Sequence, residues 1–135
     1  MFDTKVAILV LDELAVWQKL NVTAFLATGI AHAAPNAMGE VYVDAAGRQF
    51  SSLLGQPIMV YAASCDNLAR AHRLSADHGL TCAAYVRAMF STGHDAANRE
   101  AFLAEDAASP DLVGLALRGP KKLVDKAVKS AKLHP

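Results

Sequence analysis

Short apolar runs alternate with longer mixed segments along the chain. Four nearly unbroken apolar runs, at residues 5–11, 58–63, 80–86 and 112–117, are typical of buried strands. The spacing of the other apolar residues predicts helices over about 19–33, 66–78 and 95–105, and a last helix that begins at 119–120. Residues 38–50 favour a weak hairpin that turns at Ala46-Gly47. Strands that alternate with helices indicate an α/β layer fold with a largely parallel or mixed sheet.

Several residues of these segments suit the ends of helices. Asp66 is a plausible N-cap for the second helix, and Gly79 follows that helix as the residue that leaves the helical conformation. Asp95 could cap the third helix. In the last helix, four residues at i, i+3, i+4 and i+7 form one apolar face, namely Val124, Ala127, Val128 and Ala131.

The first helix is apolar on nearly every side. Its large apolar residues include Leu20, Phe25 and Ile30, and its small residues Ala24 and Ala27 would allow close packing. A helix of this kind is either central in the fold or packed at a subunit interface. The pattern alone leaves both alternatives open.

Composition narrows the class of protein. The chain has 135 residues, of which 53% are hydrophobic, so we expect one domain over residues 1–135 and exclude disorder as its main state. Lys plus Arg and Asp plus Glu both number 13, and this zero net charge disfavours nucleic acid as a partner bound by bulk electrostatics. Two cysteines make no disulfide framework, and no apolar run is long enough to cross a bilayer. We therefore expect a cytoplasmic protein without a membrane segment.

The segment 91–99 is the most polar, motif-like stretch, and it lies between a strand end and a helix start. Amides at the start of a helix favour an anion, so this segment could contact a phosphate, a carboxylate or a peptide end. His94 could act there as an acid or a base. The alternative is an ordinary helix cap, in which Asp95 bonds the Asn98 amide and His94 is solvated.

Two other positions could face the same cleft. Lys19 and Asn21 lie at the start of the first helix, and Arg87 follows the third strand. Arg87 could hold an acidic ligand or could instead pair with Glu100 or Asp95. No pair of His, Asp or Glu has the spacing of a zinc site, and no glycine-rich nucleotide motif is present, so we expect no metal and no cofactor.

The end of the chain resembles a known family. Residues 114–126, Gly-Leu-Ala-Leu-Arg-Gly-Pro-Lys-Lys-Leu-Val-Asp-Lys, are similar to the G-P-x-x-L-[IV]-D-K pattern near the end of type II peptidyl-tRNA hydrolases. Residues 5–10, Gly79-Leu80-Thr81 and Lys19 resemble that family too. A closer resemblance is to DUF2000, a family of uncharacterised, mostly bacterial proteins on the same fold, at residues 19–21, 44–47 and 90–99. The resemblance implies a three-layer, four-stranded mixed sheet flanked by helices, and a homodimer.

The chain departs from the hydrolase pattern at the residues that matter for catalysis. Counted from Gly79, the aspartate of the hydrolases falls on Arg87, which cannot act as a base. Their threonine falls on Ser91, one lysine on Lys19 and a second lysine on Asn21. The resemblance therefore favours a protein that binds a small anionic ligand and does not cleave peptidyl-tRNA by the usual mechanism.

Three hypotheses remain open from the sequence. The first is the anion-binding module, and the second is a hydrolase of peptidyl-tRNA or a related ester. The third is an interaction protein whose first helix makes a homodimer. The residues expected to act in catalysis are Lys19, Ser91 and His94, and those expected to bind a ligand are Asn21, Arg87, Thr92, Asp95, Asn98 and Arg99.

Overall fold

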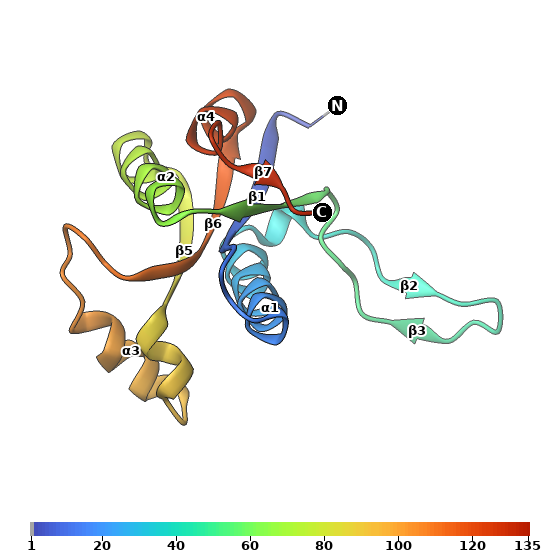
Figure 1. Ribbon diagram of the computed structural model, residues 1–135. Coiled ribbons are helices and arrows are strands. Elements are labelled where there is room, and N and C mark those ends of the chain that lie inside the picture. The colour runs from blue at the N-terminus through green and yellow to red at the C-terminus, as the bar shows by residue number, and fades with distance from the viewer. Residues whose placement is uncertain (1) are drawn as a thin grey trace.

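A mixed β-sheet forms the centre of the molecule, shown here by a computed structural model that describes residues 2–135 (Figure 1). The strands of the sheet are β1 (Thr4–Leu11), β4 (Ile58–Ala63), β5 (Thr81–Val86), β6 (Leu112–Pro120) and β7 (Lys132–Leu133). Their order is β5-β6-β1-β4-β7. Only β1 and β4 run parallel, while the other neighbours are antiparallel. The predicted α/β class is confirmed, but the prediction of four strands is wrong because the sheet has five.

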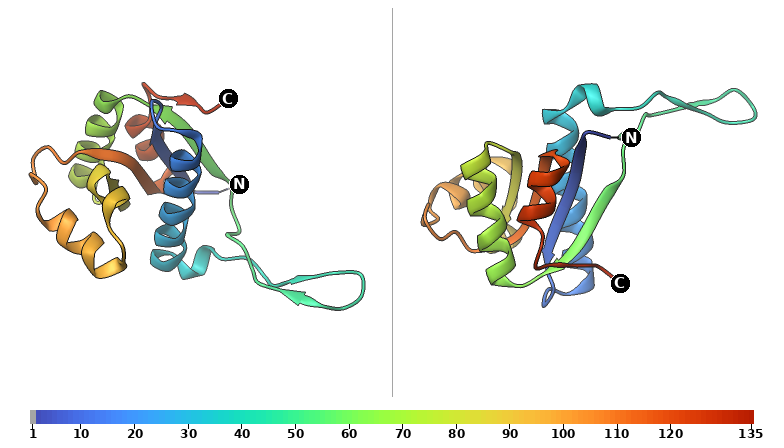
Figure 2. Two further views of the ribbon diagram at one scale, coloured as in Figure 1. Left: turned by 60° about the horizontal axis from the view of Figure 1, so that its bottom comes forward. Right: turned by 90° about the horizontal axis from the view of Figure 1, so that it is seen from above.

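Helices cover both faces of the sheet. α1 (Val16–Ala33) lies on one face, and α2 (Cys65–His78) and α4 (Lys121–Ala127) lie on the other, as Figures 1 and 2 show. α3 (Asp95–Leu103) follows the 3-10 turn η2 (Arg87–Ser91) and lies beside the end of β5. This arrangement leaves the outer edge of β5 between α1 and α3.

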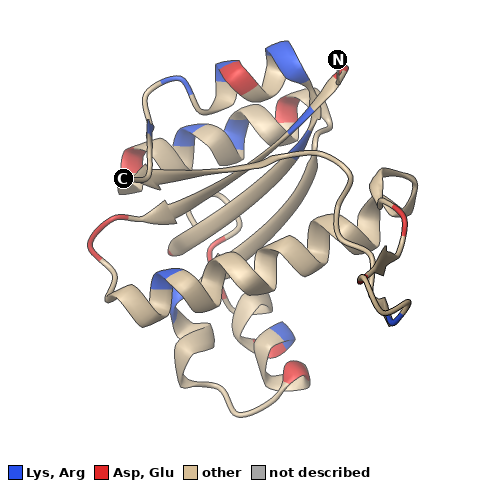
Figure 3. Ribbon diagram, turned by 90° about the vertical axis from the view of Figure 1, so that its right-hand side faces the viewer, with Lys and Arg blue, Asp and Glu red and all other residues tan. Residues whose placement is uncertain are grey.

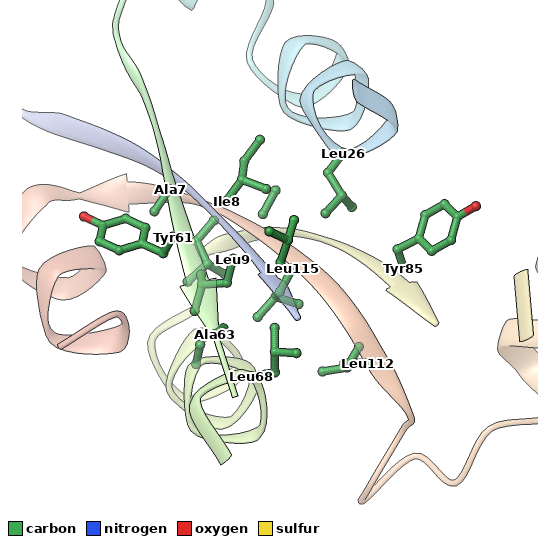
Figure 4. Close-up of a cluster of buried hydrophobic side chains, with 14 of the residues drawn as sticks. Ala7, Ile8, Leu9, Leu26, Tyr61, Ala63, Leu68, Tyr85, Leu112 and Leu115 are labelled. Carbon is green, nitrogen blue, oxygen red and sulfur yellow. The ribbon is translucent and has the colours of Figure 1, made fainter. Parts of the chain in front are cut away.

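The core is built around β1, whose residues from Val6 to Leu11 are all buried. Figure 4 shows Leu9 and Leu115 between α1, which contributes Leu26, and α2, which contributes Leu68. A strand buried on both faces needs apolar residues at every position, which is why the run is continuous rather than alternating. Gly114 lets α1 approach β6, because a Cβ there would overlap Val22 Cγ1.

Two predicted helix caps are wrong by one or two residues, and one predicted helix end is confirmed. Ser64 caps α2, since its hydroxyl accepts the Asn67 N–H at 3.1 Å. Asp66 lies within the first turn of α2, where a carboxylate still stabilises the positive end of the helix dipole. Gly79 ends α2 with φ 62°, a left-handed conformation that favours glycine.

The last helix is shorter than predicted. It ends at Ala127, and Lys132-Leu133 then pairs with β4 as the fifth strand. The backbone N–H of His134 continues this pairing with a hydrogen bond of 2.9 Å to the carbonyl of Val60. A helix that continued to the end of the chain would leave that edge of β4 unpaired, which is why the final residues form a strand.

A hairpin projects from the body between α1 and β4, and we call residues 39–55 the arm (Figures 1 and 2). It follows the 3-10 turn η1 (Pro35–Ala37) and contains β2 (Tyr42–Val43) and β3 (Gln49–Phe50), which confirms the predicted hairpin. Gly47 makes the turn with φ 82°. The backbone at the base is closed by hydrogen bonds from Gly39 N–H to Leu53 and from Gly55 N–H to Ala37.

Candidate functional site

A hollow of about 330 Å³ lies between α1, the end of β5, η2 and the start of α3. We call it the aromatic hollow. Its lining residues come from two parts of the sequence that lie far apart, 17–25 and 85–98: Trp17, Asn21, Phe25, Tyr85, Met89, Phe90, Thr92, Gly93, His94, Asp95 and Asn98. Five of the nine residues predicted to act in catalysis or binding are among them, namely Asn21, Thr92, His94, Asp95 and Asn98.

Four aromatic side chains in contact form the apolar part of this hollow. Trp17 meets Phe90 edge-on, with ring centroids 6.0 Å apart and an angle of 68° between the rings. Tyr85 lies 5.3 Å from Phe90 and 6.2 Å from Phe25, measured between ring centroids. Trp17 and Phe25 are nevertheless 61% and 56% exposed, so part of each ring is free to meet another molecule. These spacings are those of attractive edge and tilted ring contacts.

The polar part of the hollow is held in place by hydrogen bonds within the segment 89–98. The Thr92 hydroxyl donates to the Met89 carbonyl at 2.9 Å and contacts the Asn98 side-chain amide. His94, and not the predicted Asp95, is the N-cap of α3, because its Nδ1 accepts the Ala97 N–H at 3.2 Å. With Nδ1 as acceptor, the neutral imidazole carries its hydrogen on Nε2, which is then a donor.

The charges at the hollow are already paired. Asp95 and Arg99 form an ion pair one turn apart on α3, which leaves no net charge on this part of the helix. Burial raises the pKa of the Tyr85 phenol, so this side chain stays neutral across the physiological range. The aromatic hollow therefore combines aromatic rings with hydrogen-bonding groups, and the carboxylate in its lining, Asp95, is paired with Arg99.

A larger hollow of about 750 Å³ continues along the outer edge of β5. It shares Phe25, Tyr85, Met89, Asp95 and Asn98 with the aromatic hollow and adds Arg99, Cys82 and the end of α3. Cys82 is exposed as a residue, but desolvation of its thiol raises the pKa of that group, against the opposite effect of its hydrogen bond with Ser75, so the thiol is protonated near neutral pH. Arg99, predicted as a ligand-binding residue, lines this larger hollow but not the aromatic hollow, so it lies next to the predicted residues that line the latter.

Lys19 lies apart from the aromatic hollow, although it was predicted to face the same cleft. Its Nζ is 3.1 Å from Asp12 Oδ1 and 3.3 Å from His134 Nε2, and its side chain is only 16% exposed. Asp12 follows β1 directly, and His134 follows β7. Lys19 is thus held at the carboxyl end of β1, outside the residues that line the aromatic hollow.

Arg87 and Ser91 also lie outside the lining of both hollows. Arg87 Nε is 3.1 Å from Asp111 Oδ2, and its Nη2 is 3.9 Å from Glu13 Oε1. The expectation that Arg87 is paired holds, but the expected partners, Glu100 and Asp95, are wrong. Ser91 is exposed at the end of η2. The structure therefore places Lys19, Ser91 and His94 in separate surroundings.

The aromatic residues are the part of the hollow that the sequence analysis missed. A signal for them exists, because Trp17, Asn21 and Phe25 are spaced by four residues and so share one face of α1. Among residues 2–135, no group of three or more His, Cys, Asp or Glu side chains could hold a metal ion. No helix in that range is long and apolar enough to cross a membrane.

Comparison with known proteins identifies a family and similar solved structures. Residues 4–135 match the family described as "Protein of unknown function (DUF2000)". The structure of a protein of unknown function, Atu0240 from Agrobacterium tumefaciens str. C58, is similar with a TM-score of 0.96 and 47% sequence identity. The similarity covers 100% of both chains. No curated protein matches the chain.

Proposed function

Since the chain belongs to DUF2000, a family of unknown function, we propose its function from the hollow itself: it binds a small organic compound that carries a flat ring. The observation that carries this proposal is the chain of contacts between Trp17, Phe90, Tyr85 and Phe25 around one hollow. Exposed aromatic side chains lose little freedom when they stack on a planar ligand, so they bind rings favourably.

Neutral hydrogen bonds would orient this ring. Asn21, Thr92 and Asn98 offer amide and hydroxyl groups, and His94 offers the Nε2–H donor. Binding sites for small molecules commonly combine an apolar lining with a few polar groups of this kind. A hydroxyl, carbonyl or carboxylate on the ligand would be recognised by these groups.

The predicted preference for an anion becomes the secondary part of this proposal. A phosphate or carboxylate without a ring could bind Arg99 only by breaking its ion pair with Asp95. The other two predicted cations, Lys19 and Arg87, form ion pairs with residues outside the hollow. A carboxylate attached to a ring could instead accept from His94 Nε2 while the ring provides most of the binding energy. The ring is therefore expected to matter more than the charge.

Trp17 provides a direct test, because it is the only tryptophan of the chain and it lines the hollow. We expect its emission to shift to the blue when benzyl alcohol or benzoate is titrated in at fixed protein concentration. Acetate and inorganic phosphate, which carry the charge without the ring, are expected to leave the emission unchanged. A response to the two anions alone would favour the anion site instead, and no response to either ring compound would contradict the proposal.

Two substitutions next to each other sharpen this test. The Thr92 hydroxyl already donates its hydrogen to Met89, so its oxygen can accept from an alcohol O–H. Thr92→Val removes this acceptor while it keeps the side-chain shape, and should weaken benzyl alcohol binding about fivefold, the value of one hydrogen bond. Ser91→Ala is the matched control, since Ser91 is exposed and does not line the hollow. Equal affinities for both variants would remove Thr92 from the site.

Hydrolysis of peptidyl-tRNA or a related ester is the second candidate, and the contacts of Lys19 favour it. Its ammonium group lies between Asp12 and His134 at the carboxyl end of β1, the kind of sheet edge where α/β proteins bind ligands. We expect Lys19→Ala to abolish hydrolysis of such an ester. Lys122→Ala, which changes an exposed residue of α4, should leave the rate of hydrolysis unchanged. Turnover that survives Lys19→Ala would remove this assignment.

A further inference from the structure

Two apolar surfaces of the chain are left largely uncovered by the body. The first is the outward face of α1, where Val16 is 71% exposed, Trp17 61% and Leu20 66%. The second is the arm, whose exposed apolar side chains are Val41, Tyr42, Val43, Phe50 and Leu53. Large contiguous apolar surfaces of this kind mark interaction sites in soluble proteins.

The outward face of α1 carries no charged residue. Figure 3 shows a single blue segment and no red one on this helix, which has one Lys and no Arg, Asp or Glu. That residue, Lys19, contacts Asp12 and His134. The other charged residues lie mostly on α2, α4 and the loops. An outward helix face five turns long without a charge is unusual for a surface that meets only water.

The arm is also poorly supported by the chain itself. Its two strands have two residues each, and a two-stranded hairpin is marginally stable in water. The arm extends away from the sheet and the helices (Figure 2). Its tyrosine and phenylalanine side chains, Tyr42 and Phe50, are 55% and 56% exposed. More than half of each of these two side chains is therefore free to contact another molecule.

We propose that the partner is a second copy of this chain, which packs α1 against α1 and lays each arm over the other copy. A two-fold pairing is isologous, so the same two surfaces on each chain cover one another. Trp17, Leu20, Ala24, Ala27 and Ala31 alternate at spacings of three and four residues, which gives a continuous seam for helix pairing.

The two helices run antiparallel in this pairing. The arm leaves the body just after the end of α1, beyond Ala33. An antiparallel arrangement brings each arm next to the start of the partner copy's α1, where Val16, Trp17 and Leu20 are most exposed. Because Trp17 also lines the aromatic hollow, the second copy flanks the mouth of that hollow.

The available area is enough for a stable dimer. Large apolar side chains expose on the order of 100–250 Å² each when free, so the half-exposed set on α1 and the arm offers roughly 1,000 Å² per copy. Two copies would then remove up to roughly 2,000 Å² from water, at the upper end of the standard interface size. Because every copy carries the same two surfaces, a two-fold pairing covers both at once, which favours a second copy over an unrelated protein.

Light scattering after size-exclusion chromatography tests the pairing. We expect the wild-type protein at micromolar concentration to have twice the chain mass of 14.3 kDa. Leu20→Glu should yield monomers, because it buries a charge in the seam. Leu103→Glu is the matched control, since Leu103 is 86% exposed at the end of α3, outside both surfaces. This control variant should remain a dimer. A monomeric wild type, or equal behaviour of the two variants, would overturn the proposal.

Two more variants locate the seam and the arm independently. Ala24 lies at the middle of the seam, so Ala24→Cys should form a disulfide between copies when native Cys65 and Cys82 are replaced by serine. The double variant Tyr42→Ser with Phe50→Ser should weaken the dimer at least tenfold while circular dichroism of the body stays unchanged. A dimer that forms no such disulfide and tolerates the arm variant uses another surface, which would also overturn the proposal.

Discussion

The body and the arm contain similar kinds of apolar residue but bury them very differently. In the body, every residue from Val6 to Leu11 is at most 2% exposed. In the arm, Tyr42, Val43 and Phe50 are all more than half exposed. The body is therefore stabilised by close packing of apolar side chains. The arm is stabilised by backbone hydrogen bonds and by the Asp44 carboxylate in its turn.

This difference predicts which kind of change each region resists. A region stabilised by packing loses stability when atoms are added or removed, because its neighbours cannot fill or open the space. A region stabilised by hydrogen bonds to a charged group responds to pH instead. The three predictions below test this contrast, beginning with the change expected to have the largest effect.

Gly114→Ala should destabilise the body most. The new Cβ would overlap Val22 Cγ1 and lie 3.0 Å from Leu26 Cδ1. Both side chains belong to α1 and are buried in the core, so they have little room to move. We expect a loss of about 3 kcal/mol or more in the free energy of unfolding by urea, at the upper end of overpacking effects. Gly93→Ala is the control, because nothing lies within 4 Å of a Cβ there. Similar stability of both variants would contradict the close approach of α1 to β6.

Leu9→Ala compares the two regions directly when it is set beside Leu53→Ala. Leu9 is fully buried in β1, so its truncation should cost about 2–5 kcal/mol in urea unfolding. Leu53 is 60% exposed in the arm, and its truncation should cost the body no more than about 0.5 kcal/mol. Any further loss for Leu53→Ala should depend on protein concentration, as expected if the arm acts through a second copy. Equal losses in dilute protein would contradict the contrast.

The sequence was sufficient for the class of the fold and for most strands. Short continuous apolar runs favour buried strands because most helices are longer, and β1, β4, β5 and β6 all fall on such runs. The two faces of α1 were harder, because Val22 and Leu26 are buried while Leu20 and Phe25 are exposed. Since both faces are apolar, periodicity cannot tell them apart.

The candidate site was predictable in its polar loop but not in its charges. The loop residues Thr92, His94 and Asn98 were found because they adjoin a helix start. The partners of Lys19 and Arg87 were not, because His134 and Asp111 come from distant parts of the chain. Which charges neutralise one another depends on how the strand ends meet, and no local pattern carries that information.

The smallest expected effect concerns the turn of the arm. The carboxylate of Asp44 accepts the backbone N–H of Arg48 at 3.0 Å and that of Ala46 at 2.9 Å, and it pairs with Arg48 Nε at 2.7 Å. These bonds, led by the one from the Arg48 backbone, hold the pKa of Asp44 below its ordinary value of 3.8. A carboxyl group whose pKa is lower in the folded state stabilises that state above its ordinary pKa.

The stabilisation by Asp44 is therefore complete at neutral pH and is lost as the pH falls through the lowered pKa. Amide hydrogen exchange of Ala46 and Arg48 measures it, and both amides should lose protection in acid before those of β1 do. Asp44→Asn keeps an acceptor without the charge, so its arm amides should be less protected at neutral pH and should show no such step. An unchanged acid step in that variant would mean that another group controls the turn.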